Sequence, residues 1–178
     1  PDTTGIKGEV IVPRWSRSVY DHAIRSTGMK MVEVDTLEDL EKAFGPRTAM
    51  ATGQINLAAE GNPFTLEQFV AAAHRHGVPV VMDVADRLPL VPNPYLSRGV
   101  DLVAYSGGKI IRGPQTAGML LGRKDLVAAA FMNSAPHHAF ARAVKVSKEE
   151  VVGMVKAIEL LRTGKRSRDA EDAEWRAW

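Results

Sequence analysis

The 178-residue chain contains no cysteine. This absence excludes a disulfide framework, a zinc site built on thiolates and a cysteine nucleophile. Long hydrophobic runs are missing too: none approaches the ~18 residues that a membrane span needs, and no basic-then-apolar leader opens the sequence. We therefore expect no membrane partner and take a cytoplasmic location as the default. The first residue is Pro1 rather than Met, so we expect a piece of a longer protein.

An excess of charge of one sign is also missing. Lys and Arg number 23 against 21 Asp and Glu, which leaves a formal net charge of +2. Such a small excess does not indicate a nucleic-acid partner. Hydrophobic residues make up 45% and charged residues 25%, which is typical of a soluble globular protein. The length is sufficient for one domain with its own core.

Short apolar segments alternate with helical patterns along the whole chain. Strands are expected at residues 9–13, 30–34, 48–52, 78–83, 101–106 and 116–122, and helices at 17–28, 36–45, 65–77 and 147–162. Thr65 with Gln68, and Ser147 with Glu150, have the spacing of a capping box. The charged tail, residues 163–178, is expected to form a frayed helix or to be ordered only by a partner.

This alternation predicts βαβ units and a mostly parallel, doubly wound α/β sheet covered on both faces. In such sheets, ligands bind at the carboxyl ends of the strands. The rule selects two places, Asp83 at the end of "VPVVMD" and residues 106–109 at the end of "DLVAYS".

Lys109 lies in "VAYSGGKIIRGPQTAG", a run with little other charge. The run fits neither the P-loop pattern nor the G-x-G-x-x-G dinucleotide fingerprint. Lys109 is therefore either a surface lysine after a turn or a partly desolvated amine that forms a Schiff base.

Asp83 follows a nearly apolar segment. It either caps a turn or pairs with a cationic group of a ligand. Asp83 and Asp86 together could suggest a magnesium site, but nothing nearby supplies further oxygen ligands in an obvious pattern. We predict no metal site.

The two places together fit a pyridoxal phosphate (PLP) site. A carboxylate at Asp83 would keep the pyridine nitrogen protonated, and the amine of Lys109, 26 residues later, would carry the cofactor as an imine and move protons at the substrate α-carbon. The small Ala85 would let the ring lie flat against the strand. Ser106 and Gly108 would offer donors to the phosphate.

The segments "VVMDVAD" and "AYSGGKIIRGPQTAGMLLGRKDL" resemble the fold-type-I PLP enzymes of the aminotransferase superfamily. "PDTTG", "YDHAIR", "HRHGVPVVMD" and "NSAPHH" followed by "KVSKEE" are similar, more narrowly, to the group of bacterial selenocysteine synthase and D-glucosaminate-6-phosphate ammonia-lyase, on the ammonia-lyase side. The resemblance covers about residues 1–161. It implies PLP as the cofactor, Lys109 as the Schiff-base lysine, Asp83 as the pyridinium partner and Ser106 near the phosphate.

The same resemblance implies a substrate side lined by Arg142, His137 and Gln115. It implies that residues 1–145 are part of the PLP-binding large domain. Residues 146–178 would begin the C-terminal small domain or form a linking helix with a charged tail.

Family members are about twice as long, and their first portion holds a glycine-rich phosphate loop with no counterpart here. Where they carry a Gly-His pair whose histidine could stack on the cofactor ring, this chain has Trp15 and Ser16, so that role is either lost here or passes to Trp15. Because sites of this fold type form at a dimer interface, a homodimer or higher homo-oligomer is expected.

The function implied is α,β-elimination from an amino acid or amino sugar acid, with Lys109 removing the α-proton. Transamination, racemization and aldol cleavage remain open, because the shared machinery determines only the carbanion. An alternative of another class is a truncated, non-catalytic partner subunit. Chemistry on tRNA, by analogy with selenocysteine synthase, is disfavoured by the balanced charge.

Overall fold

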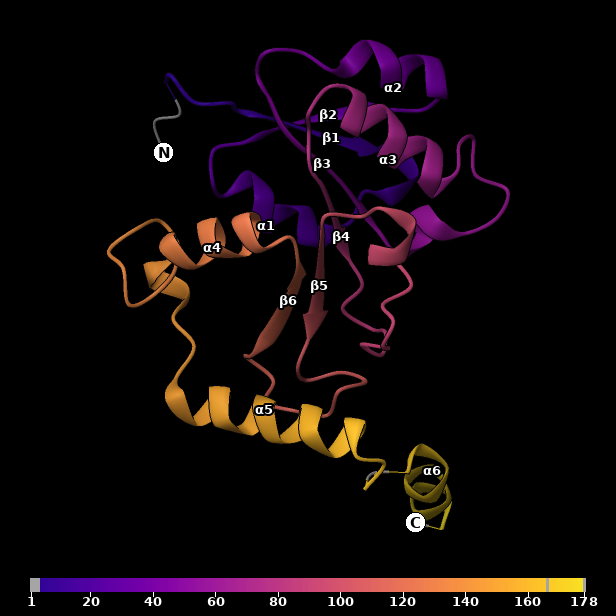
Figure 1. Ribbon diagram of the computed structural model, residues 1–178, viewed down its shortest axis with the longest axis vertical. Helices are drawn as coiled ribbons and strands as arrows, with labels where there is room; N and C mark the ends of the chain where they lie inside the picture. The colour runs from indigo at the N-terminus through magenta and orange to yellow at the C-terminus, as the bar shows by residue number, and fades with distance from the viewer. Residues whose placement is uncertain (1–3, 166, 178) are drawn as a thin grey trace.

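The computed structural model describes residues 4–165 and 167–177 and is built on a six-stranded sheet (Figure 1). The strands are β1 (Glu9–Pro13), β2 (Lys30–Val34), β3 (Thr48–Gln54), β4 (Val80–Asp83), β5 (Leu102–Ser106) and β6 (Gly118–Gly122), in the order β2-β1-β3-β4-β5-β6. The first four pairings in this order are parallel, and β6 is antiparallel to β5. The mostly parallel α/β sheet expected from the sequence is confirmed.

Six α-helices accompany the strands in the described part of the chain. They are α1 (His22–Arg25), α2 (Leu37–Ala43), α3 (Leu66–Arg75), α4 (Lys124–Met132), α5 (Lys148–Arg162) and α6 (Arg168–Arg176). The capping boxes that begin with Thr65 and Ser147 are both formed, which confirms the predicted starts of α3 and α5. None of the helices in this part is long and apolar enough to cross a membrane.

One helix prediction is wrong and one helix was missed. Instead of one helix over residues 17–28, the chain forms a 3-10 turn, Val19–Asp21, and then the short α1. The reason is a capping box between Ser18 and Asp21, which starts a new element at that point. Helix α4 was not expected, and no side chain caps its first turn, so the sequence carries no start signal there.

The two faces of the sheet are covered unequally. On one face α2 and α3 pack together, and α3 buries five residues, including Phe69. On the other side lie α1 and α4 (Figure 1), and no residue of either helix is buried. The main core therefore lies between the sheet and the α2–α3 layer.

Asp101 joins the amino ends of the strands. Its carboxylate, 5% exposed, accepts hydrogen bonds from the Val80 amide at 2.8 Å, from Nε2 of His74 at 2.8 Å and from Nη1 of Arg123 at 3.1 Å. Burial by itself would raise the pKa of Asp101, but these bonds hold it below its ordinary value. Because they connect α3, β4 and the end of β6, they set β4 and β5 in register, so that the carboxyl ends of these strands come together.

Candidate active site

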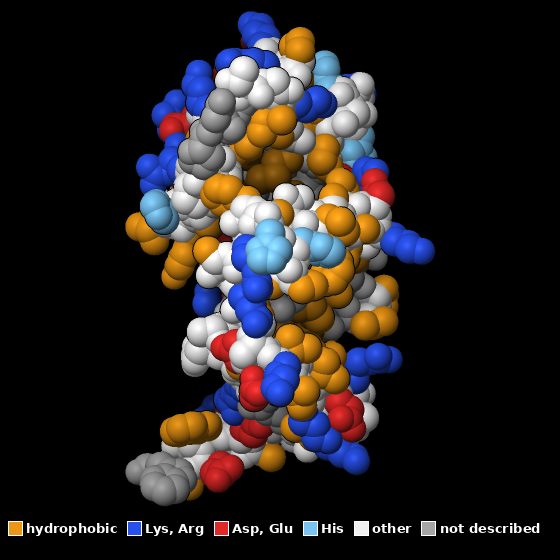
Figure 2. Space-filling model, turned by 90° about the vertical axis from the view of Figure 1, so that its left-hand side faces the viewer, with side chains coloured by type: hydrophobic (Ala, Val, Ile, Leu, Met, Phe, Trp, Pro, Cys, Tyr) orange, Lys and Arg blue, Asp and Glu red, His pale blue; other side chains and the backbone are white. Residues whose placement is uncertain are grey.

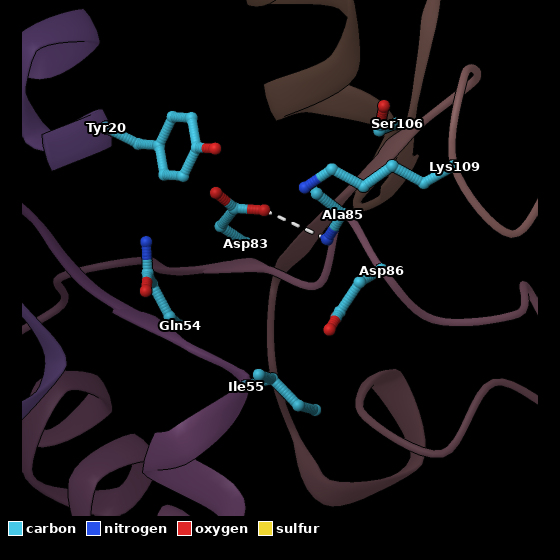
Figure 3. Close-up of a pocket in the computed structure, with 8 residues that line it drawn as sticks. All are labelled: Tyr20, Gln54, Ile55, Asp83, Ala85, Asp86, Ser106 and Lys109. Atoms are coloured by element: carbon cyan, nitrogen blue, oxygen red, sulfur yellow. Dashed lines mark hydrogen bonds between the residues drawn. The ribbon is translucent and has the colours of Figure 1, made fainter. Parts of the chain in front are cut away.

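The carboxyl ends of β3, β4 and β5 surround a pocket of about 400 Å³ (Figure 3). The side chains that line it are Tyr20, Gln54, Ile55, Asp83, Ala85, Asp86, Ser106 and Lys109. In the sheet Gln54 pairs with Asp83, and Asp83 pairs with Ala104, two residues before Ser106. The pocket therefore brings together four of the five residues predicted to bind the cofactor.

Asp83 is half-buried at the end of β4. Its Oδ1 accepts a hydrogen bond from the Ala85 amide at 3.0 Å. This bond is the turn contact that was one of the two interpretations of Asp83, and it also fixes the direction of the carboxylate. No described residue donates a hydrogen bond to Oδ2. The hydrogen bond to Oδ1 thus orients the carboxylate, and Oδ2 can contact a ligand.

A closed loop presents Lys109. The Gly107 amide donates to the Ala117 carbonyl at 2.8 Å, the Gly113 amide donates to the Gly107 carbonyl at 2.7 Å, and Ile111 is completely buried. These contacts hold both ends and the middle of the loop. Lys109 projects from its outer side and reaches across the pocket (Figure 3).

The lysine is more exposed than expected. We predicted a partly desolvated amine, whereas Lys109 is an exposed residue, because the pocket opens to solvent beside the exposed Tyr20 and Asp86. Its ammonium lies 5.6 Å from the centroid of the Tyr20 ring. Within the described ranges, no carboxylate forms an ion pair with it.

The two glycines before Lys109 are needed for close packing rather than for flexibility. A Cβ on Gly108 would lie 2.3 Å from Oε1 of Gln115, and one on Gly107 would lie 2.7 Å from the Ala117 carbonyl oxygen. Any side chain there would force the loop apart. Gln115 packs against Gly108 and does not line the pocket, and the substrate role of Gln115 and the cofactor role of Gly108 stay predictions.

Arg142 and His137 lie on the segment after α4, outside the pocket. Arg142 begins a short 3-10 turn. His137 contacts the edge of Phe131, with ring centroids 5.2 Å apart, and its buried Nε2 has no hydrogen-bond partner among the residues that the structure describes. Their substrate-binding roles therefore stay predictions.

Sequence reasoning missed Tyr20, Gln54 and Ile55 in the pocket. The strand-end rule would have selected Gln54, but the strand was expected to end at residue 52, two residues too early. Tyr20 lies in the turn that begins at the capping box of Ser18 and Asp21, a spacing that the sequence reasoning did not use. Trp15, one of the two alternatives for a ring-stacking role, packs against Phe64 with ring centroids 4.8 Å apart and does not line the pocket.

The residues that line the pocket are of the types that a PLP site needs. A carboxylate oxygen, a primary amine, a small side chain and a hydroxyl line one pocket at the carboxyl edge of a mostly parallel sheet. No group of three or more His, Asp or Glu suited to a metal ion occurs in the described part of the chain. The fold and this pocket together define a PLP-dependent enzyme of fold type I.

Comparison with known proteins identifies the family. Residues 21–165 match aminotransferase class-V, and the chain belongs to this family, whose cofactor is PLP. The chain is 32% identical over 169 residues to D-glucosaminate-6-phosphate ammonia lyase of Salmonella typhimurium. The matched region covers 89% of this chain and 44% of the relative. The chain is also 30% identical over 161 residues to L-seryl-tRNA(Sec) selenium transferase of Moorella thermoacetica, covering 79% and 33%.

The solved structures agree. A structure of D-glucosaminate-6-phosphate ammonia-lyase superposes with a TM-score of 0.79 and 30% identity, over 90% of this chain and 44% of that one. The predicted family, fold and cofactor are confirmed. The chain spans less than half the length of these relatives.

Proposed function

We propose that the protein catalyses α,β-elimination from a small amino acid or amino sugar acid, with Lys109 as the base at the α-carbon. The observation that carries the proposal is the presence of Asp83 and Lys109 in one pocket at the strand ends (Figure 3). When bound, PLP supplies an electron sink for the carbanion left by α-proton removal.

Asp83 and Ser106 would hold the cofactor. Asp83, oriented by the Ala85 amide, presents its second oxygen to the pyridine nitrogen, and this charge pairing favours the protonated ring. The methyl group of Ala85 leaves room for a flat ring. Ser106, at the end of the neighbouring strand, offers a hydroxyl to the phosphate.

Lys109 would hold and move the proton. Its long flexible stem lets the amine take a proton from the substrate α-carbon and deliver it to the departing β-group. Arg142 would bind an anionic group of the substrate, because its guanidinium can contact a carboxylate or phosphate through two parallel hydrogen bonds. His137 and Gln115 would line the same side.

Elimination is preferred over the other reactions because the 32%-identical relative is an ammonia lyase. Transamination, racemization and aldol cleavage begin with the same kind of carbanion and are the runner-up activities. To separate them, candidate amino acids and amino sugar acids are incubated with the full-length protein in D₂O. Release of ammonia and a keto acid supports elimination, whereas α-deuteration without such release overturns it. The Lys109→Arg variant, which keeps the positive charge, should give neither signal.

A second copy of the chain would cover an exposed apolar face. Large hydrophobic side chains are exposed over α4, the segment after it and α5: Phe131, Met132, Phe140, Val144, Val151, Val152 and Val155. Figure 2 shows apolar side chains gathered on this side of the molecule. Patches of this kind mark protein contacts, so we propose a homodimer or higher homo-oligomer in the cytoplasm. Light scattering together with the intact mass tests this, and a stable monomer that binds PLP tightly would contradict it.

The alternative of another class is a non-catalytic partner subunit. Such a subunit would not bind PLP, so added cofactor would produce no visible absorbance band in the protein. Oδ2 of Asp83, which accepts no hydrogen bond from any described residue, and the Lys109 amine directed across the pocket (Figure 3) favour the enzyme.

A further inference from the structure

The turn that carries Tyr20 is firmly held. The Tyr20 amide donates to Oγ of Ser18 at 3.1 Å, and the Ser18 amide donates to Oδ2 of Asp21 at 3.2 Å. Asp21 is 6% exposed and also accepts a hydrogen bond from the Arg17 side chain. The Tyr20 side chain itself is 65% exposed. Tyr20 is therefore an exposed side chain on a fixed backbone.

The same turn is connected to the strand beside Asp83. Nε2 of Gln54 donates to Oγ of Ser18 at 2.6 Å, and Gln54 is the residue that pairs with Asp83 between β3 and β4. The backbone of Tyr20, from which the ring projects, is thereby set relative to the carboxylate of the site. An aromatic residue on an unattached loop would have no fixed position relative to Asp83.

The Tyr20 ring is the partner of the Lys109 ammonium. Their separation, 5.6 Å from Nζ to the ring centroid, lies within the ~6 Å at which an aromatic face attracts a cation. A lysine stem rotates freely unless its ammonium finds a partner. In Figure 3 the Lys109 side chain extends across the pocket toward Tyr20, with Asp83 close to the line between them. The ring thus lies where it can keep the amine directed into the pocket.

We propose that Tyr20 is a positioning residue whose ring face, not its hydroxyl, keeps the Lys109 amine over the pocket. The inference rests on the proposed function, in which Lys109 is the working amine. Its consequence is a larger population of pocket-directed Lys109 before any ligand arrives. The ammonium held there first releases its proton to solvent, and an amine that is already near its target then reacts faster because less orientational freedom is lost.

The test compares Tyr20→Leu with Tyr20→Phe in full-length protein freed of cofactor. Lysines are methylated with ¹³C, and the Lys109 signal is assigned with Lys109→Arg. We expect an upfield ring-current shift in the parent protein and in Tyr20→Phe, and its loss in Tyr20→Leu. In separate, unmethylated samples, capture of added PLP, followed by visible absorbance, should slow by about 2–5-fold in Tyr20→Leu, the change that a cation–π contact at an exposed site supports.

Val19→Ala is the matched control, because Val19 lies on the same turn, is 83% exposed and does not line the pocket. It should behave like the parent protein. An unshifted Lys109 signal in the parent protein, or Tyr20→Phe behaving like Tyr20→Leu, would overturn the inference. Absence of PLP capture at Lys109 in the parent protein, with the ring-current shift present, would instead overturn the proposed function and leave the contact established.

Discussion

Replacing Gly107 by alanine should separate the lysine loop from the structure beneath it. An added Cβ would lie 2.7 Å from the Ala117 carbonyl oxygen, 2.8 Å from the Pro114 carbonyl oxygen and 3.0 Å from Sδ of Met154. The two closest atoms belong to the backbone, so no side-chain rotation relieves the clash. Overpacking of this kind costs about 1–3 kcal/mol, reduced by the ~0.4–1 kcal/mol that alanine contributes by restricting the unfolded chain. Lys109, two residues away, would be displaced from the pocket.

Urea unfolding and PLP absorbance measure both consequences. Gly45→Ala is the matched control, because a Cβ there meets nothing within 4 Å, and it should be neutral or slightly stabilising. Met154→Ala should not rescue Gly107→Ala, because the two carbonyl contacts remain. If Gly107→Ala keeps the stability and the cofactor absorbance of the parent protein, the packing argument for the loop is wrong.

Three further predictions concern charged groups. Asp83→Asn should retain the fold, as measured by circular dichroism. It should reduce α-proton exchange by orders of magnitude, because a neutral amide does not stabilise a pyridinium. Normal exchange in this variant would contradict the prediction. Asp101→Asn should lose about 2–3 kcal/mol of stability at pH 7 in urea unfolding, because charge-assisted hydrogen bonds to a buried group are lost. Since the pKa of Asp101 is lowered in the folded state, its contribution is complete above the ordinary value of 3.8 and is lost as the pH falls below it, so the variant should lose less stability than the parent protein between pH 6 and pH 3. Arg142→Lys should raise the Michaelis constant strongly and leave the cofactor spectrum unchanged, and an unchanged constant would remove Arg142 from the site.

The rule that ligands bind at the carboxyl ends of parallel strands located much of the pocket, because it depends only on the local pattern of apolar segments. Asp83 and Ser106 end short apolar segments, and parallel strands bring their carboxyl ends to one edge whatever the details of packing. These parts of the fold and the site could be read from the sequence.

The rest depended on tertiary contacts. The exposure of Lys109 follows from how the neighbouring turn is placed, and the sequence does not encode that placement locally. Tyr20 enters the pocket because Ser18 and Gln54 hold its turn against β3. A ring-stacking role was considered for Trp15 because of its position relative to the histidine of the family. In the structure its large apolar ring packs on Phe64 in the core, which is more favourable. Helix α4 lacks a capping side chain, so its start could not be predicted from the sequence.

The most direct test of the account is to map the lysine that binds the cofactor. The full-length protein is loaded with PLP, reduced with borohydride and digested, and the peptides are sequenced by mass spectrometry. The account predicts the pyridoxyl label on Lys109, in the peptide that contains "SGGKIIR", and no visible absorbance band in Lys109→Ala. A label on another lysine, with Lys109→Ala keeping the band, would contradict it.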